Sequence, residues 1–300
     1  MWLFLLSILL LSPAEAKQTQ HQIRKDSATW TFTQRWTDSE NKKHSVQFSL
    51  PSKSIVQDLK APLQYPEQHA AQYIAKEVRK WGKKNNYSVK AKAINGRVNI
   101  QVSAQISDIR KIMRAAKKVR DDAYERYFER QGYTQIRMPF RLRKGVMPNH
   151  MEHVKSYATE LSPLVVALGG PTKDPRDFAN KALSYVQNIP YEQRSLVSDR
   201  YRRPLSLIGK NQGDCDSKSV LFLALMHSAY PDMDLGMVYI RGHAFAALGL
   251  KPTIGQRSLF HKWQRWILVE PVGPALEPIG KISPKSLLLS KLQLYRMRTL

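Results

Sequence analysis

The chain has 300 residues and a formal net charge of +24, from 48 Lys and Arg against 24 Asp and Glu. This length suffices for one large domain or two modest ones with hydrophobic cores. So basic a chain favours anionic partners, namely nucleic acid, lipid headgroups, cell-wall polymers or acidic proteins. The single cysteine, Cys215, excludes an intramolecular disulfide.

Residues 1–16 have the pattern of a signal peptide. Trp2 to Leu11 is almost purely apolar, and "SPAEA" then places Ala14 and Ala16 in a cleavage pattern. The apolar run is shorter than the roughly 20 residues of a membrane-spanning helix. We therefore expect cleavage near Ala16 and a periplasmic or secreted protein, with a retained N-terminal anchor as the alternative.

The first half of the chain alternates paired strands with helices. Hydrophobic alternation predicts a hairpin over 28–50, and helical spacing predicts a helix from Pro66 to about Asn85. Asn95-Gly96 between two alternating runs indicates a second hairpin. A long basic helix is expected over 107–131, ended by Gly132. This ββαββα order predicts an α+β domain over 25–135 that contains a repeated ββα unit.

A basic segment interrupted by proline and glycine separates this region from a second one. Residues 136–149 are expected to form a linker, or a strap that enters the active cleft. A second α+β domain is expected over 150–282, with helices at 150–168, 175–188 and 215–229 and three strands after them. Residues 189–214 are a long polar connection, of the kind that is often functional. The tail 283–300 is expected to contain a short helix.

The sequence around Cys215, "NQGDCDSKSVLFLALM", predicts a thiol at the start of a buried helix. Asp214 is a good N-cap, and the amino end of a helix favours a thiolate. Two carboxylates beside it oppose ionisation, so a cationic partner is required. The alternative is that the cysteine only fills space in the core.

The expected partners of the thiol follow on strands. His243 in "YIRGHAFAAL" is the candidate base, and Glu270 in "RWILVEPVG" ends the next strand. On adjacent antiparallel strands the carboxylate can hold one imidazole nitrogen and leave the other to face sulfur. This is the logic of a Cys-His-carboxylate triad. Taken singly, each residue is more often structural than catalytic.

The phrases "PLSLIGKNQGDCDSKSVLFLALM", "GHAFAAL" and "WILVEPV" resemble the core of the bacterial transglutaminase-like proteins. These are papain-like thiol enzymes that include periplasmic cysteine proteinases, and the resemblance covers about 170–275. It implies a Cys-bearing central helix packed on an antiparallel sheet, with Cys215 as nucleophile, His243 as base and Glu270 as the third residue. The family commonly has Asp at the third position, and often Trp where this chain has Phe245.

The resemblance implies an exported thiol enzyme that acts on amide or peptide bonds of a protein or peptide substrate through an acyl-enzyme. Water as acceptor makes it a peptidase or amidase, and an amine makes it a transglutaminase. The oxyanion is expected to bind the Cys215 N–H and one further donor, Gln212 or Tyr191.

A second hypothesis is an inactive module that binds an anionic polymer or membrane surface through its basic residues. No metal or cofactor is expected, because zinc-ligand spacing and a Gly-rich phosphate loop are lacking. A specific nucleic-acid motif is lacking too.

Overall fold

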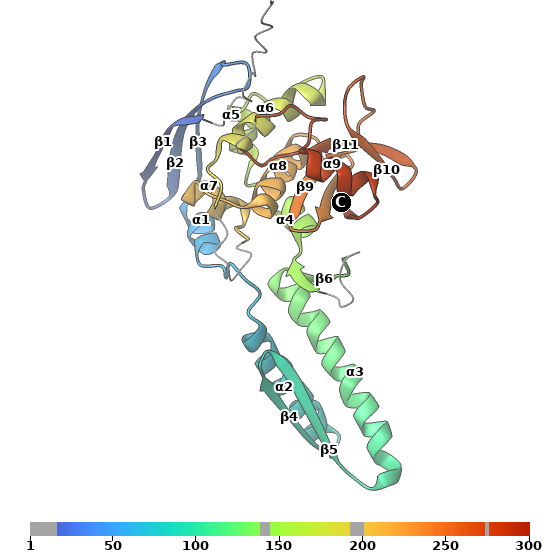
Figure 1. Cartoon of the computed structure of the whole chain (residues 1–300). Helices are drawn as coiled ribbons and strands as arrows, with labels where there is room; N and C mark the ends of the chain where they lie inside the picture. The colour runs from blue at the N-terminus through green and yellow to red at the C-terminus, as the bar shows by residue number, and fades with distance from the viewer. Residues whose placement is uncertain (1–16, 139–144, 193–200, 274–275) are drawn as a thin grey trace, which may run out of the picture. The chain divides into compact units, whose positions relative to one another are not determined.

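The computed structural model describes residues 17–138, 145–192, 201–273 and 276–300. Helix and sheet are mixed in it, as an α+β chain requires. The chain divides into two compact units. One unit contains residues up to Ala61 together with His153–Leu300, and the other is Pro62–Glu152. Figure 1 shows the helices and strands, coloured from blue at the N-terminus to red at the C-terminus.

The first unit begins with a three-stranded antiparallel sheet of β1 (Lys17–Lys25), β2 (Thr29–Thr37) and β3 (Lys43–Pro51). Alternation buries one face, where Phe32 of β2 lies opposite Phe48 of β3. This face contacts the helices α5 (Ser162–Ala167) and α6 (Pro175–Asn188). Trp36 Nε1, for example, donates to Ser184 Oγ of α6 at 3.0 Å.

The second sheet of this unit has five antiparallel strands in the order β10-β11-β9-β8-β12. They are β8 (Leu235–Ile240), β9 (His243–Leu248), β10 (Ser258–His261), β11 (Gln264–Val269) and β12 (Arg296–Thr299). Helix α8 (Cys215–Ala229) contacts β8 and β9, and it is buried nearly all round. Its continuous apolar surface explains this central position.

Four further helices complete the first unit or lead into it. Leu289 of α9 packs against the cluster that Phe245, Trp266 and Leu268 form on the five-stranded sheet. Helix α7 contacts both α1 and α8. The bounds are α1 (Ser52–Leu59), α4 (His150–Tyr157), α7 (Pro204–Lys210) and α9 (Pro284–Lys291).

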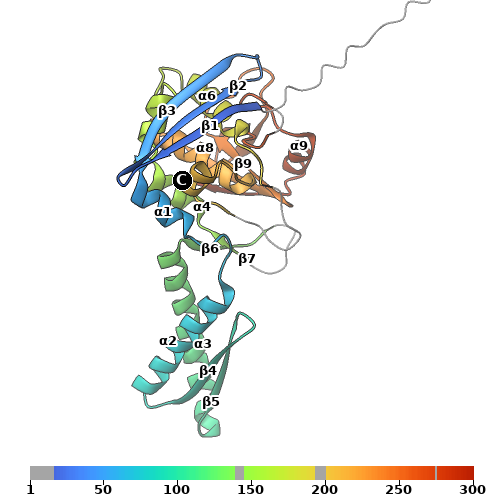
Figure 2. The ribbon, with the colours of Figure 1, turned by 90° about the vertical axis from the view of Figure 1, so that its left-hand side faces the viewer.

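The second unit consists of two helices on a hairpin and a small two-stranded sheet. Helices α2 (Glu67–Lys84) and α3 (Ile106–Gln131) contact the hairpin of β4 (Ser88–Ile94) and β5 (Arg97–Ser103). Its core includes Ala75, Val78, Ala91 and Ala116. Strands β6 (Tyr133–Ile136) and β7 (Gly145–Pro148) pair with each other. Figure 2 shows the hairpin and both helices from a second side.

Several elements confirm the predictions from local pattern. The turn residues Asn95 and Gly96 have φ of 48° and 72°, as the hairpin prediction requires. Gly132 ends α3 with φ of 70°, in the left-handed conformation that glycine adopts without strain. Helices α2, α3, α6 and α8 agree with their predicted ranges within a residue or two.

The expected domain boundaries were wrong in one respect. Residues 25–135 do not form one domain, because the buried face of the first sheet packs on α5 and α6 of the first unit. The first hairpin belongs to one unit, whereas its expected helix α2 lies in the other unit with the whole second ββα segment, so the two ββα segments are not a structural repeat. The first sheet also has an unpredicted strand, β1, whose polar sequence lacks a clear alternation.

Other local predictions also needed correction. The helix expected at 150–168 is two helices, α4 and α5, and the expected linker 136–149 includes strand β7. Helices α1 and α7 and strands β10 and β12 were not predicted. The proposed signal peptide at 1–16 and the strap residues 139–144 lie outside the described residues. Within the described ranges, no helix is both long and apolar enough to cross a bilayer.

Candidate active site

Cys215 is the first residue of α8, and the turn before it is firmly held. Asp214 caps the helix, because its Oδ1 accepts from the Ser217 backbone N–H at 2.9 Å and from Ser217 Oγ at 2.6 Å. Gly213 forms a parallel bridge with Tyr191. Cys215 is 1 % exposed, and its Sγ lies 3.4 Å from Asp216 Oδ1. The thiol is thus placed at the amino end of the buried helix.

His243 is the first residue of β9, directly after a tight turn. Ile240 of β8 pairs with His243, which leaves Arg241 and Gly242 as a two-residue connection. Gly242 has φ of 73°, a conformation that other residues rarely adopt. The turn therefore brings the imidazole to the end of the sheet.

Glu270 directly follows β11, and the strand register brings it to His243. Val269 pairs with Ala246, so the next residues along, Glu270 and Phe245, lie opposite each other. His243 is two residues from Phe245 and shares its face of the sheet. His243 Nε2 and Glu270 Oε1 are 2.7 Å apart, with side chains 20 % and 10 % exposed.

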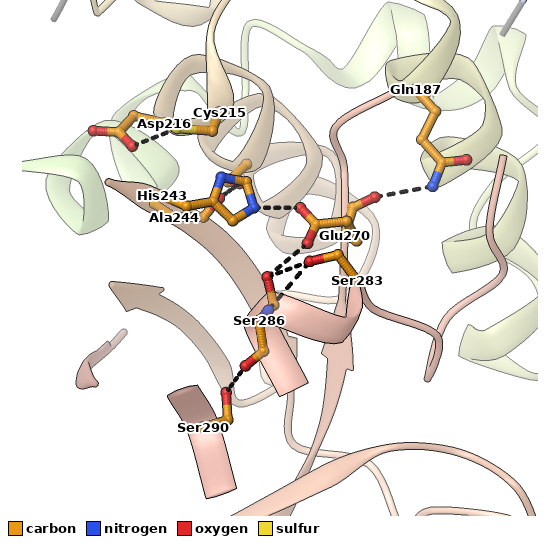
Figure 3. A network of polar contacts seen from close by, with 10 residues as sticks. Gln187, Cys215, Asp216, His243, Ala244, Glu270, Ser283, Ser286 and Ser290 are labelled. Carbon is orange, nitrogen blue, oxygen red and sulfur yellow. Dashed lines mark hydrogen bonds and ion pairs between the residues drawn. The ribbon is translucent and has the colours of Figure 1, made fainter. Parts of the chain in front are cut away.

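Glu270 is also held from two other elements. Its Oε2 accepts from Ser286 Oγ of α9 at 3.2 Å, and its backbone carbonyl accepts from Gln187 Nε2 of α6 at 2.9 Å. Because both carboxylate oxygens have partners, the side chain has one preferred orientation. Figure 3 shows these contacts converging on Glu270.

The contact with Glu270 decides which nitrogen of His243 carries the proton. An ionised carboxylate only accepts hydrogen bonds, so Nε2 must be the N–H donor in the neutral ring. Nδ1 is then the basic nitrogen, and Figure 3 shows it on the edge of the ring turned toward Cys215. This arrangement can take a proton from a thiol.

A buried lysine, Lys218, lies one helical turn after Cys215. Its Nζ donates to the carbonyls of Ile189 at 2.7 Å and Gln187 at 3.2 Å. The loss of hydration on burial lowers the pKa of Lys218 to about 7. Since Gln187 Nε2 also donates to the backbone carbonyl of Glu270, Lys218 links the cysteine helix to the Glu270 backbone through α6. The sequence signal for this site is a lysine two residues before the apolar run that begins at Val220.

An ion pair close to the helix start was also missed. Arg202 Nε and Nη2 donate to the two carboxylate oxygens of Glu192, each at 2.7 Å, and both side chains are largely buried. The Arg202 backbone N–H donates to Ser217 Oγ at 2.8 Å. This pair therefore anchors the two chain segments beside α8.

The two oxyanion candidates lie on the segments next to Cys215. Tyr191 is placed by its bridge to Gly213, and the Gln212 backbone N–H donates to the Leu207 carbonyl at 3.3 Å. These contacts place the two backbones, and an oxyanion role for either side chain stays a prediction. In the part of the chain that the structure describes, no group of three or more His, Cys, Asp or Glu side chains could hold a metal ion.

Comparison with known proteins identifies no relative. No family model matches the chain, and no curated protein or solved structure is significantly similar to it. The interpretation of the site therefore depends on its residues and their geometry.

Proposed function

We propose that this chain is an exported thiol-dependent enzyme that acts on amide or peptide bonds through an acyl-enzyme. The proposal assigns Cys215 as nucleophile, His243 as general base and Glu270 as the residue that orients the imidazole. It includes a transglutaminase-like, papain-like architecture for the unit that contains α8 and the five-stranded sheet. The observation that carries the proposal is the 2.7 Å contact of His243 with Glu270, which leaves Nδ1 toward Cys215.

The proposed reaction has two stages. Cys215 Sγ attacks the carbonyl carbon as His243 Nδ1 takes the thiol proton, and a tetrahedral intermediate forms. The imidazolium returns that proton to the leaving amine as the C–N bond breaks, which leaves a thioester on Cys215. Water, or a second amine, then attacks the thioester, with His243 taking its proton and restoring the thiol. Of these two acceptors we propose water, so that the thioester is hydrolysed.

The buried state of Cys215 sets a condition on this chemistry. A side chain that is 1 % exposed reaches a substrate carbonyl only after its covering atoms move. The imidazole of His243 is 20 % exposed, so the pair is most accessible on that side. The rate at which a thiol-alkylating reagent labels the chain measures this access directly.

The test compares Cys215→Ala with the unchanged protein in two assays. A thiol-reactive probe and cleavage of a peptide library should both lose their signal in the variant, while its melting temperature stays close to that of the parent. Since Cys215 is the only cysteine of the chain, labelling by the probe reports on this thiol alone. Peptide cleavage that persists in Cys215→Ala would remove the nucleophile assignment.

A second candidate is an inactive module that binds an anionic partner, and the burial of Cys215 favours it. Under this proposal Cys215→Ala leaves binding to an anionic polymer unchanged, and no peptide is cleaved by either protein. Detection of an acyl-enzyme by mass spectrometry would exclude it.

A further inference from the structure

Half of the net charge of the chain is concentrated in one part of the second unit. Residues 76–120 contain fourteen Lys or Arg and only two carboxylates, Glu77 and Asp108. Their net charge is +12, against +24 for the whole chain. A charge that served only solubility would be spread evenly over the chain, and these cations are instead concentrated in one part of it.

One end of this unit combines these cations with exposed apolar side chains. Helix α2 ends at Lys84 and α3 begins at Ile106, and Ser88 pairs with Ser103 between them. The connections 85–87 and 104–105 therefore lie side by side at the same end, which can be followed in Figures 1 and 2. We call this end the basic tip and define it by six exposed residues, Lys83, Lys84, Tyr87, Ile106, Arg110 and Lys111.

The apolar part of the basic tip is unusual for a surface in water. Ile106 is 91 % exposed and Tyr87 is 38 % exposed. The Tyr87 ring centroid lies 5.4 Å from that of Trp81, so two amphipathic aromatic side chains are in contact at the end of the unit where α3 begins with Ile106. Tyrosine and tryptophan are the residues that prefer the boundary between water and lipid.

We propose that the basic tip binds the surface of an anionic lipid bilayer. Ile106 and the Trp81–Tyr87 pair enter the headgroup boundary, and Lys83, Lys84, Arg110 and Lys111 contact lipid phosphates. Apolar insertion together with attraction to anionic lipid is the combination that holds peripheral proteins on membranes. This surface does not depend on the proposed catalysis.

The exposed isoleucine favours lipid over nucleic acid as the partner. An aliphatic side chain gains free energy when it leaves water for the acyl boundary. It cannot stack on a base as an aromatic ring does, and it forms no hydrogen bond with a phosphate. A single-stranded oligonucleotide would use the cations and rings of this end but would leave Ile106 in water.

The test measures co-sedimentation of the chain from Lys17 onward with vesicles, at physiological salt. This chain retains every described helix and strand and lacks the apolar residues 1–16. Binding to phosphatidylglycerol-containing vesicles is expected, with little binding to phosphatidylcholine alone. Lys83→Glu with Lys84→Glu should weaken binding at least about 30-fold, because each lysine near the membrane surface contributes about fivefold and the new carboxylates add repulsion from the anionic lipid.

The matched control is Lys117→Glu with Lys118→Glu, two exposed lysines of the same unit and the same change of charge. They follow Ile106 by about 16 to 18 Å along α3 and follow Lys111, the last residue of the basic tip, by about 9 to 10 Å, which is more than one screening length at physiological salt. The control should weaken binding less than about threefold. An equal loss of vesicle binding in the two double variants would show that the overall charge of the chain attracts the lipid. The proposal that the basic tip is the binding surface would then be rejected.

Ile106→Ser separates the apolar contribution from the electrostatic one. Because the side chain is 91 % exposed, the variant should melt like the parent. Vesicle binding should weaken about tenfold, from the lost apolar burial, while binding to a single-stranded oligonucleotide should not change. Unchanged vesicle binding in Ile106→Ser, or an oligonucleotide bound more tightly than anionic vesicles, would overturn the proposal.

Discussion

His243 Nε2 lies 2.7 Å from Glu270 Oε1, and this contact joins the start of β9 to the residue after β11. The two strands are neighbours in the sheet, so the pair is positioned by backbone hydrogen bonds. Ser286 and Gln187 hold Glu270 from two helices. Because these contacts fix the orientation of Glu270, the effect of each substitution on the His243–Glu270 pair can be predicted separately.

Glu270→Gln should reduce kcat about 100-fold or more with little change in KM. The new amide NH₂ can donate to Nε2, which moves the ring proton to Nδ1 and removes the base that faces Cys215. Steady-state kinetics of peptide cleavage measure the effect. Glu277→Gln, which removes the same charge seven residues later, is the control and should retain kcat. An unchanged kcat in Glu270→Gln would refute the orienting role.

Ser286→Ala should reduce kcat about three- to tenfold. Its hydroxyl is buried and donates to Glu270 Oε2, and a hydrogen bond of this kind contributes about 1 kcal/mol. The matched control is Ser290→Ala in the same helix, because Ser290 Oγ donates to the Ser286 carbonyl and not to Glu270. Equal losses of kcat in the two variants would mean that α9 matters only for packing.

Lys218 should make the folded protein more stable as the pH rises above 7. Its pKa is lowered to about 7 in the fold, while in the unfolded chain it is about 10.4. Between these values the unfolded chain binds one proton more, so the free energy of unfolding rises with pH, by up to about 1.4 kcal/mol per unit.

Lys218→Met removes this titration, and its stability should rise less with pH than that of the parent. Urea unfolding at several pH values from 7 to 9 measures both slopes. Lys285→Met, at an exposed lysine of α9, should keep the parental slope. Parallel curves for the parent and Lys218→Met would show that the lysine does not lose its proton in this range.

Tyr185→Phe should destabilise the first unit by about 1–3 kcal/mol. The Tyr185 hydroxyl of α6 donates to Gln34 Oε1 of β2 at 2.7 Å, and both side chains are buried. Without the hydroxyl, a buried amide oxygen loses this partner. Urea denaturation measures the loss, and Tyr87→Phe, at a more exposed tyrosine, should lose much less. A loss in Tyr185→Phe no larger than that in Tyr87→Phe would argue against a buried link between the first sheet and α6.

The sequence by itself determined those elements whose cause is local. The apolar stripes of α2 and α3, the Asn95-Gly96 turn and the Asp214 cap of α8 each follow from neighbouring residues, and each is present. The chain order of Cys215 at a helix start, His243 at a strand start and Glu270 directly after a strand could be read in the same way.

Only the tertiary structure decided how distant segments meet. It assigned β1–β3 to the unit that contains Cys215, added β12 to the edge of β8, and buried Lys218 against the carbonyls at the end of α6. The 2.7 Å contact of His243 with Glu270 depends likewise on which residues of β9 and β11 are paired. Such pairing and burial minimise the exposed apolar surface of the whole chain, and no local pattern contains that information.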